Sequence, residues 1–558
     1  MKRPFRGLRT AGPRRSYDTV VVGAGIGGLV AANLLAREGL AVLLVEQHYM
    51  AGGFCSTFRR GGYTFDAATH FYPLLGNRET LTGRLLVELG IETGWVKMDP
   101  VDTFHFPDGS RFAVPADFAA YRARLDAEFP EERSALDRFF SLANEAYLLG
   151  LLAYFRGRVP PRLEPLRELT VREVLDRSFR NEKLKLLLTA DCPHWGSPPG
   201  RTSFVFDSML RLSYFLGNYY PRGGSQAFAD ELALRFEERG GDILMSTRVD
   251  RVVVEEGSVR GVEMETLRGP LRGRRRVAAE AVVSNADLLQ TYERLLGARW
   301  VPPEELSALR ALRPTYPCFL THIGLRDVSS EVLEEAQGYY WAEWDPDRVG
   351  RDGLVCKVFA PTLYEPAMAP PGGQVVILQK VLEMDYDGVT DWAAHKARVE
   401  GFVVGHLERV IPGVRERISV LLSASARTSW RFTLNTQGAM LGWEMSPEQL
   451  GDGRPGIRSP VDGLYLVGHW TRPGGGITPV IVSAMRAAEA VLGSDGAALS
   501  APAVAPALAR AAPASGLGDR PAVAARAATR RAGKRAAPGL PDAVAAAARG
   551  LLSWEGAR

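Results

Sequence analysis

The stretch "YDTVVVGAGIGGLVAANLLAREGLAVLLVEQ", Tyr17 to Gln47, determines the fold at the start of the chain. Its β-branched run Thr19–Val22 predicts a buried strand, the Ala/Leu segment Leu29–Leu35 predicts a helix, and Ala41–Val45 predicts a second strand. Two buried strands joined by a helix form a βαβ unit, and such units build parallel sheets. We therefore predict an α/β fold whose first sheet begins almost at the N-terminus.

The turn inside this unit predicts dinucleotide binding. Gly23, Gly25 and Gly28 form a G-x-G-x-x-G between the strand and the helix. The first glycine permits the tight turn, the second lets the backbone approach a pyrophosphate, and the third packs helix against strand. The helix N-terminus offers unpaired N–H groups to the phosphates. Glu46 ends the second strand, where a carboxylate can accept both hydroxyls of an unphosphorylated ribose.

Three further features favour FAD over NAD. Gly52 and Gly53 follow Glu46 too closely for an ordinary NAD-binding domain, and a glycine pair there lets the loop fold back under a pyrophosphate. In "STRVDRV", Val249 is positioned to lay its backbone against an adenine edge. Near the C-terminus a predicted strand, "GLYLVG", leads through a glycine-rich turn into a helix that begins near Ile477. The positive end of that helix suits a flavin ring, which becomes anionic on reduction.

Four motifs carry a family resemblance: "VVGAGIGGLVAA…EQHYMAGGFCSTFRRGGYTFDAATHF", "YYPRGGSQAFADEL", "VVSNAD" and "GLYLVGHWTRPGGGITPVIVSA". In this order they resemble the FAD-dependent carotenoid desaturase, carotenoid isomerase and retinol saturase family, the phytoene desaturase-like flavin oxidoreductases. The resemblance spans roughly residues 17–493. It implies noncovalently bound FAD, an apolar polyene substrate and peripheral association with a membrane. The implied fold is a discontinuous Rossmann-like FAD-binding domain of the flavin amine oxidase/phytoene desaturase type with an inserted mixed α+β substrate domain.

The resemblance also assigns cofactor contacts to residues of this chain. Gly23, Gly25 and Gly28 would hold the pyrophosphate and Glu46 the adenosine ribose, while Gly52 and Gly53 would line the pyrophosphate and Val249 would meet the adenine. The ribityl chain and isoalloxazine would contact the C-terminal turn at Gly468, His469, Gly475, Gly476 and Ile477. Phe54 stands where many relatives have Arg, which favours the isomerase and saturase branch. His469 stands where flavoproteins often have an acid.

The alternation of patterns along the chain predicts how the domains are assembled. Residues 17–100, 216–298 and 456–494 show the α/β pattern and are predicted to form the FAD-binding domain. Residues 101–215, read as long helices, and the mixed segment 299–455 are predicted to form the substrate domain. Two tails flank this body: residues 1–16 are basic, and residues 495–558 are Ala/Pro/Arg-rich, which predicts disorder.

Charge and composition exclude several classes of protein. The net charge of +4 arises in the tails, since residues 1–16 hold six Lys/Arg and no acid, and residues 496–558 hold nine Lys/Arg against three acids. The remaining body is acidic, which argues against nucleic-acid binding. The four cysteines are too scattered for a disulfide framework or a metal site. With no apolar run of spanning length and no secretory signal, we predict a cytoplasmic protein, peripheral at the membrane.

Two residues are candidates for moving protons. His70 follows "YTFDAAT" and is predicted either to lie beside the flavin, where it would transfer protons at neutral pH, or to be a hydrogen-bonded structural residue. Glu444, next to Trp443 in "LGWEMSP", is predicted either to face the substrate or to be structural. Asp66 is read as a turn residue and Cys55 as a small buried side chain.

These features predict an FAD-dependent oxidoreductase acting on a carotenoid or related polyene, by desaturation or cis–trans isomerisation with hydride or electron exchange at flavin N5. The alternatives are a retinol saturase-like polyene reductase, a flavin amine oxidase, or a membrane-associated scaffold that binds FAD without catalysis. No second G-x-G-x-x-G follows a predicted strand. We therefore expect electrons to pass to or from a quinone or another separate carrier.

Overall fold

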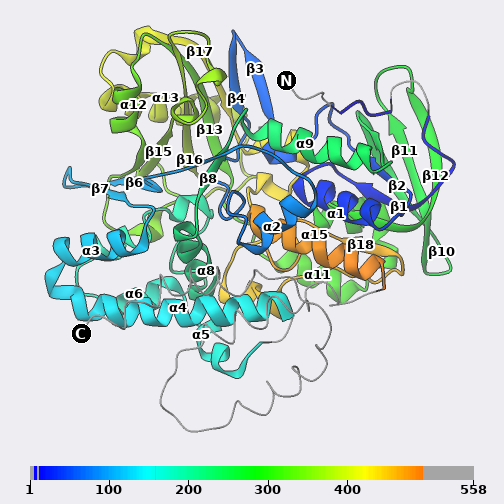
Figure 1. The fold of residues 1–558 in the computed structure, drawn as a ribbon, viewed down its shortest axis with the longest axis horizontal. Coiled ribbons are helices and arrows are strands. Elements are labelled where there is room, and N and C mark those ends of the chain that lie inside the picture. The colour runs from blue at the N-terminus through cyan, green and yellow to red at the C-terminus, as the bar shows by residue number, and fades with distance from the viewer. Residues whose placement is uncertain (1–4, 9–11, 157–158, 494–558) are drawn as a thin grey trace. The chain divides into compact units, whose positions relative to one another are not determined.

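The computed structural model describes residues 5–8, 12–156 and 159–493. The predicted tail at 495–558 lies outside the described residues, as does part of the predicted basic tail at 1–16. The described residues form two large β-sheets with helices packed on them (Figure 1).

The first sheet gathers strands from three distant parts of the chain. Its order is β10-β11-β12-β1-β2-β9, and β18 pairs with β12. The strands are β1 (Ser16–Val22), β2 (Val42–Val45), β9 (Asp242–Leu244), β10 (Thr247–Glu255), β11 (Ser258–Thr266), β12 (Gly273–Ser284) and β18 (Leu464–Leu466). β1 pairs in parallel with β2 and β12, and β12 in parallel with β18. The predicted strands are therefore confirmed, and the discontinuous assembly of the sheet with them.

Three helices cover one face of this sheet. They are α1 (Ile26–Arg37), α9 (Ser225–Glu238) and α15 (Ile477–Val491), which share one apolar core with β2 and β9. Figure 1 shows α1 and α15 side by side. Every residue of α1 from Ile26 to Ala36 is buried, which explains why its sequence is Ala/Leu-rich on all sides rather than amphipathic.

The second sheet has the order β17-β13-β16-β15-β14-β6-β7. Its strands are β6 (Asp102–His105), β7 (Arg111–Val114), β13 (Cys318–Arg326), β14 (Gly338–Trp341), β15 (Val355–Phe359), β16 (Gly373–Val381) and β17 (Ile418–Ala424). Only the β14–β6 pair is parallel among these ladders. Residues 102–114 were expected to be helical, and this expectation was wrong: they pair with each other and then with β14.

Helices cover both faces of the second sheet. α12 (Ser330–Ala336) and α13 (Trp392–Val410) share a core with one face. The other face shares a core with helices of the segment 118–215. These helices are α3 (Phe118–Glu128), α4 (Arg133–Arg156), α5 (Glu164–Arg167), α6 (Val171–Ser178), α7 (Glu182–Leu187) and α8 (Phe204–Phe215). The helical prediction thus holds for this segment beyond β7.

A hairpin joins the two parts of the molecule described above. β3 (Thr57–Arg60) and β4 (Tyr63–Asp66) are antiparallel, and both turn glycines, Gly61 and Gly62, have positive φ. Tyr63 packs so closely on β13 that a Cβ on Gly324 would lie 2.8 Å from its ring. The remaining elements include α2 (Leu81–Glu88), β5 (Trp95–Lys97), β8 (Tyr219–Pro221), α10 (Leu288–Gln290), α11 (Pro303–Ala311) and α14 (Ala426–Thr433).

The contact between hairpin and sheet predicts loss of stability in acid. His322 on β13 is 1 % exposed, packs edge-on against Phe58 and Phe65, and places Nε2 3.0 Å from the Asp66 carbonyl oxygen. Burial lowers the pKa of His322 from 6.5 to about 4. Between these values the unfolded chain binds more protons, so the stabilisation present above pH 6.5 is lost as the pH falls.

At pH 5 this single group should lower the free energy of unfolding by about 2 kcal/mol relative to pH 7.5. Urea unfolding at the two pH values will measure the difference in wild type and in His322→Gln, which keeps a donor for the Asp66 carbonyl. The variant should lose less stability on acidification. An equal loss in both proteins would show that His322 does not titrate as described.

Candidate functional site

The glycine turn between β1 and α1 is closed by its own backbone. Gly23 has φ +95°, a left-handed conformation that suits glycine. A Cβ on Gly28 would lie 2.0 Å from the Gly23 carbonyl oxygen, so only glycine lets α1 begin this close to the strand. The first-turn N–H groups of a helix have no acceptor within it, and the helix dipole adds positive charge. This end of α1 therefore suits a phosphate.

Asn285 lies at the centre of this turn and was not predicted from the sequence. It follows β12, and its Nδ2 donates to the Gly23 carbonyl at 3.5 Å. A Cβ at Gly25, Gly27 or Gly468 would come within 2.9 Å of its side-chain amide. Asn285 thus joins the glycines of the N-terminal motif to the C-terminal turn. The motif "VVSNAD" directly after a strand was the available signal.

Glu46 closes the other side of the turn. It follows β2, and its carboxylate accepts from the backbone N–H groups of Ala24 and His48, both at 2.7 Å. Burial raises the pKa of Glu46, and these backbone donors oppose that rise. The Glu46 carbonyl accepts from Thr247 N at 2.8 Å, which ties the start of β10 to the turn. Val249, two residues along β10, is buried.

The second glycine pair abuts the first motif. Gly52 forms an isolated parallel bridge with Gly25, and its N–H donates to the Ala24 carbonyl at 2.8 Å. Gly52 has φ +113°, and a Cβ there would lie 2.5 Å from the Cys55 carbonyl oxygen. A Cβ on Gly53 would lie 3.3 Å from the Gly25 Cα. The sequence-predicted pairing of the two glycine motifs in space is therefore present.

The C-terminal turn reaches the same place. The Gly468 N–H donates to Ser483 Oγ at 3.0 Å, and the ring of half-buried His469 lies 6.2 Å from that of Phe54. Burial, and then Arg454, lower the pKa of His469 to about 3, so its imidazole is neutral at physiological pH.

α15 begins just after this turn, at Ile477. A Cβ on Gly475 would lie 2.3 Å from the Leu441 carbonyl oxygen, and Gly476 caps α15 with φ +101°. The packing at Gly475 and the backbone conformation at Gly476 therefore require glycine at both positions.

The loop carrying His70 is tied to both glycine motifs. Thr69 N donates to the Phe54 carbonyl at 3.2 Å, and Thr478 Oγ1 at the start of α15 donates to the Pro73 carbonyl at 3.0 Å. His70 is 4 % exposed, and its Nδ1 lies 3.0 Å from the Ala68 carbonyl, so this nitrogen carries the proton. Within the described residues, the buried Nε2 has no hydrogen-bond partner. It is thus a free lone pair on a loop that is bonded to the segments carrying the glycine turns.

An aromatic cluster surrounds His70. The ring centroids of Phe71 and Phe359 lie 5.0 and 4.8 Å from the imidazole, and that of His194 lies 5.9 Å away. Tyr214 of α8 closes the cluster 6.4 Å from Phe71. We call these five residues the aromatic cluster. Burial, followed by Lys357 and His194, holds the pKa of His70 well below its ordinary value. A neutral base therefore lies among apolar walls.

Glu444 has a different environment. It is 1 % exposed, and its two carboxylate oxygens accept from Arg201 at 2.7 Å and from Arg313 at 3.1 Å. Neighbouring Trp443 packs edge-on against Trp470 at 4.7 Å. Arg454 connects this segment to the C-terminal turn, because it donates to the Glu444 and His469 carbonyls. Both oxygens of the carboxylate are thus already engaged by guanidinium groups.

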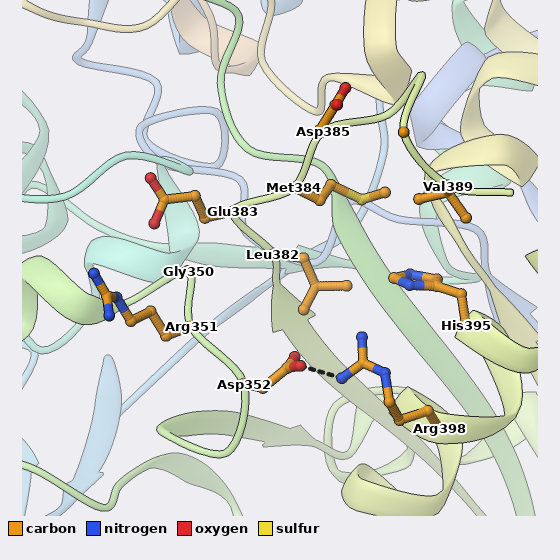
Figure 2. Close-up of a pocket in the computed structure, with 11 residues that line it drawn as sticks. Gly350, Arg351, Asp352, Leu382, Glu383, Met384, Asp385, Val389, His395 and Arg398 are labelled. Carbon is orange, nitrogen blue, oxygen red and sulfur yellow. Dashed lines mark hydrogen bonds and ion pairs between the residues drawn. The ribbon is translucent and has the colours of Figure 1, made fainter.

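A separate hollow of about 540 Å³ lies between the loop before β15, the loop after β16 and helix α13 (Figure 2). Charged side chains dominate its lining, among them the ion pair of Asp352 with Arg398, and Glu383. None of the sequence-predicted site residues lines it. We place the functional site at the glycine turns instead, because there five separate segments converge on closely packed glycine backbone.

Comparison with known proteins identifies the family. The family model for flavin-containing amine oxidoreductases matches residues 26–492. The chain belongs to this family. The enzyme is therefore an FAD-dependent oxidoreductase, and the glycine turns described above fit FAD, since a Cβ would obstruct them at several positions and the α1 N-terminus faces them.

Curated relatives match the enzyme over most of their length. It is 28 % identical over 491 residues to the neurosporene-forming phytoene desaturase of Rhodobacter capsulatus, covering 83 % of this chain and 92 % of the relative. It is 24 % identical over 523 residues to the chloroplastic prolycopene isomerase of Daucus carota, covering 86 % and 80 %. It is 26 % identical over 510 residues to human all-trans-retinol 13,14-reductase, covering 81 % and 82 %. The predicted family resemblance is confirmed.

A solved structure supports the fold class. An oxidoreductase from Methanosarcina mazei superposes with a TM-score of 0.61 at 17 % identity, covering 84 % of this chain and 98 % of that one. The predicted α/β class, with a flavin-binding sheet and a second mixed sheet, is confirmed. In the described ranges no helix is long and apolar enough to cross a membrane, and no group of three or more His, Cys, Asp or Glu is arranged to hold a metal ion.

Proposed function

We propose that the enzyme acts on a carotenoid or related polyene, by desaturation or cis–trans isomerisation. Bound FAD supplies hydride or electron exchange with the substrate. Gly23, Gly25 and Gly28 hold the pyrophosphate in this proposal, and Glu46 the adenosine ribose. The other contacts are as predicted from the resemblance: Gly52 and Gly53 at the pyrophosphate, Val249 at the adenine, and Gly468, His469, Gly475, Gly476 and Ile477 at the ribityl chain and flavin ring.

The aromatic cluster beside His70 is the observation that carries the substrate proposal. Its rings offer flat apolar surface to a conjugated chain. The loop that carries His70 and Phe71 of this cluster is anchored to Phe54 and α15, so the cluster adjoins the cofactor turns. The relatives' names, a phytoene desaturase and a prolycopene isomerase among them, describe enzymes of conjugated or isoprenoid chains. A delocalised polyene needs no strong acid, which agrees with a neutral His70.

The cluster also argues against an amine substrate. The ammonium of Lys357 lies 3.9 Å above the Phe71 ring and is 1 % exposed. A protonated amine beside Phe71 would place a second cation on the ring that Lys357 already occupies. The Asp102 carboxylate, 2.8 Å from the ammonium, offsets part of the repulsion, and the remaining penalty falls on the charged amine. An uncharged hydrocarbon meets no such penalty.

Expression in three pigment-accumulating hosts tests the substrate and the reaction together. The hosts accumulate phytoene, a poly-cis lycopene or all-trans lycopene, and pigments are separated by chromatography. We expect further double bonds from phytoene or geometric conversion of the poly-cis isomer. A Gly25→Val variant, whose side chain would strike Asn285, serves as the cofactor-free control. Unchanged pigments in all three hosts, from a flavin-loaded protein, would contradict the proposal.

Reduction of a polyene is the second candidate. The human retinol reductase relative, which covers 81 % of this chain, favours it. The same site would then deliver hydride to the substrate instead of removing it. Reduced enzyme mixed anaerobically with all-trans-retinol or lycopene distinguishes the two directions, because only a reductase would be reoxidised with loss of a substrate double bond.

Electrons reach or leave the site through a separate carrier in this proposal. The chain carries one G-x-G-x-x-G after a strand, at Gly23–Gly28, and that turn is assigned to FAD. A quinone is the carrier we propose. Reduced enzyme should be reoxidised by a short-chain quinone, whereas NADH and NADPH should leave the oxidised flavin unchanged; rapid reduction by either nucleotide would contradict this part.

The domain boundaries are a further part of the proposal. We propose that residues 17–100, 216–298 and 456–494 form the FAD-binding domain, and that 101–215 and 299–455 form the substrate domain. The strands of the first sheet all come from the former segments, and those of the second sheet from the latter, which supports the division.

We further propose that the enzyme docks on an anionic membrane through an exposed aromatic patch. The patch consists of Tyr49, Leu267 and Phe432, which the contacts below connect, and of Trp430, which shares helix α14 with Phe432; each of the four side chains is more than a third exposed. The His48 ring contacts both Tyr49 and Phe432, and the backbone of His48 and Leu267 is linked through Ser246.

Basic side chains flank this patch. Arg427 and Arg431 are exposed on the same helix, α14, and Arg431 lies over the Phe432 ring. Aromatic rings with neighbouring arginines suit the interface of a bilayer that contains anionic lipid, from which an apolar polyene would be drawn.

The double variant Trp430→Ser/Phe432→Ser should bind vesicles of phosphatidylglycerol and phosphatidylcholine several-fold less than wild type, because it removes the two largest exposed rings of the patch. Co-sedimentation measures the bound fraction. Val332→Ser, which removes an isolated exposed side chain from α12, is the matched control and should bind normally. Equal binding by all three proteins would contradict docking at this patch.

A further inference from the structure

A buried ion pair lies next to the aromatic cluster. Lys357 of β15 and Asp102 of β6 are 1 % and 7 % exposed, and Nζ lies 2.8 Å from Oδ2. The strand between them, β14, contributes Tyr339, whose ring centroid is 4.2 Å from the ammonium. The pair therefore spans three strands of the second sheet, away from solvent.

Stability alone does not account for this pair. Burying two charges costs more than their attraction returns unless their geometry and hydrogen bonding are excellent, and apolar replacements are often at least as stable. Here the ammonium has one carboxylate and two ring faces, those of Phe71 at 3.9 Å and Tyr339 at 4.2 Å. A function that needs a fixed positive charge at this point is the alternative explanation.

A single aromatic ring, that of Phe71, separates the Lys357 ammonium from two imidazoles. The Phe71 ring beneath Lys357 is 5.0 Å from the ring of His70 and 4.9 Å from that of His194. Burial lowers the pKa of His70 most, and the positive charge of Lys357 lowers it further. The same two causes lower the pKa of His194 to about 3. Burial is thus the main cause that keeps both imidazoles neutral, and the same cation adds to it.

One further ionisable group near the pair, Tyr364, is half-buried and its hydroxyl accepts from Gln337 Nε2 at 2.9 Å. The others are buried. They are Asp191 before the short 3₁₀ turn Cys192–His194, Tyr339 of β14, and Tyr214, Arg211 and Asp207 of α8. Arg211 is bound by Asp207 at 2.7 Å and by Asp191 at 3.3 Å. Arg211 is thus paired within its own cluster, whereas Lys357, paired with Asp102, is the cation that contacts the Phe71 ring.

We infer that Lys357, held in place by Asp102, is a positioning residue that keeps His70 unprotonated, so that its free Nε2 accepts the proton released by the substrate. The inference rests on the proposed function. In desaturation two C–H bonds break and one C=C bond forms: one hydrogen leaves with its electron pair to the oxidised cofactor, and the other leaves as a proton to Nε2. The resulting imidazolium later returns its proton to solvent.

Removing the positive charge of Lys357 should change the pKa of His70 in one direction. Without Lys357 the protonated form of His70 is repelled less, so its pKa rises and the base is lost at a higher pH. Lys357→Met/Asp102→Asn removes both charges while keeping the shapes. Lys380→Met is the control for loss of a buried lysine, since Lys380 lies on neighbouring β16 and donates to the Arg351 carbonyl at 2.7 Å.

The first measurement is the titration of His70 itself, in FAD-loaded protein. Histidine ring carbons are labelled with ¹³C and followed by NMR from pH 5 to 8, and His70→Gln assigns the His70 signal among the eight histidines. We expect no titration of His70 in wild type and Lys380→Met, and titration above pH 5 in the double variant. Unchanged His70 in the double variant would overturn the inference. This readout needs no substrate.

The second measurement is the rate of anaerobic flavin reduction by phytoene over the same pH range. The acid limb should move up by at least about one unit in the double variant, a tenfold lower rate on that limb, and stay in place in Lys380→Met. An unmoved limb would also overturn the inference. If phytoene fails to reduce the wild-type flavin, desaturation of phytoene is excluded as the reaction, while the NMR result still decides the role of Lys357. Lys357→Gln repeats both tests should the double variant not fold.

Discussion

Gly28→Ala is expected to yield protein without bound flavin. The added methyl would lie 2.0 Å from the Gly23 carbonyl oxygen, so α1 must shift away from the turn that receives the pyrophosphate. We expect the affinity for FAD to fall at least about 100-fold, equivalent to about 2.7 kcal/mol. The ratio of flavin to protein absorbance after purification, followed by titration with FAD, measures the effect.

Gly401→Ala is the matched control for this variant. Gly401 lies inside α13, and a Cβ there would meet nothing within 4 Å. The substitution should leave FAD binding unchanged and raise the free energy of unfolding by up to about 1 kcal/mol, the difference in helix propensity between glycine and alanine. Wild-type flavin content in Gly28→Ala would mean that the glycine turn is not the pyrophosphate site.

Glu444→Ala is expected to lower the free energy of unfolding by about 2–3 kcal/mol. Removing a buried carboxylate from a pair costs about 3–5 kcal/mol when the partner is also buried. Arg201 and Arg313 are 32 % and 56 % exposed, so water compensates them in part and the cost is discounted accordingly. Urea unfolding of the flavin-loaded protein measures this change.

Glu444→Gln then separates structure from proton transfer. The amide keeps an acceptor for a guanidinium, so its stability loss should be smaller. If Glu444 serves only to hold the two arginines, the variant should reduce its flavin with substrate at a rate close to wild type. A loss of about 100-fold or more with normal stability would instead assign proton transfer to Glu444, and would contradict our placement of that role at His70.

Local patterns allowed the first sheet to be predicted from the sequence. β1, α1 and β2 form from consecutive residues with clear periodicity, and the strand and helix around Gly468 and Ile477 do likewise. β6 and β7 were missed because each is only four residues long, and because β14, the partner through which β6 joins the sheet, lies more than two hundred residues away. No local pattern identifies such a pairing.

The candidate site likewise contains residues that could be predicted from the sequence and residues that could not. The glycines and Glu46 follow a spacing rule, so they could be predicted. Asn285 could not be assigned a role, because its importance lies in contacts with Gly23 and Gly468 that only folding creates. The role of Lys357 could not be predicted either, because it lies in the apolar strand "VCKVF" and its partner Asp102 comes from a segment that was expected to be helical.

Anaerobic mixing of the oxidised, FAD-loaded enzyme with phytoene tests the central claim most directly. We predict that the visible absorbance of the flavin bleaches as phytoene loses hydrogen, and that primary amines such as putrescine leave the spectrum unchanged. Bleaching by the amine with no response to phytoene, and no conversion of poly-cis lycopene by the reduced enzyme, would contradict the account.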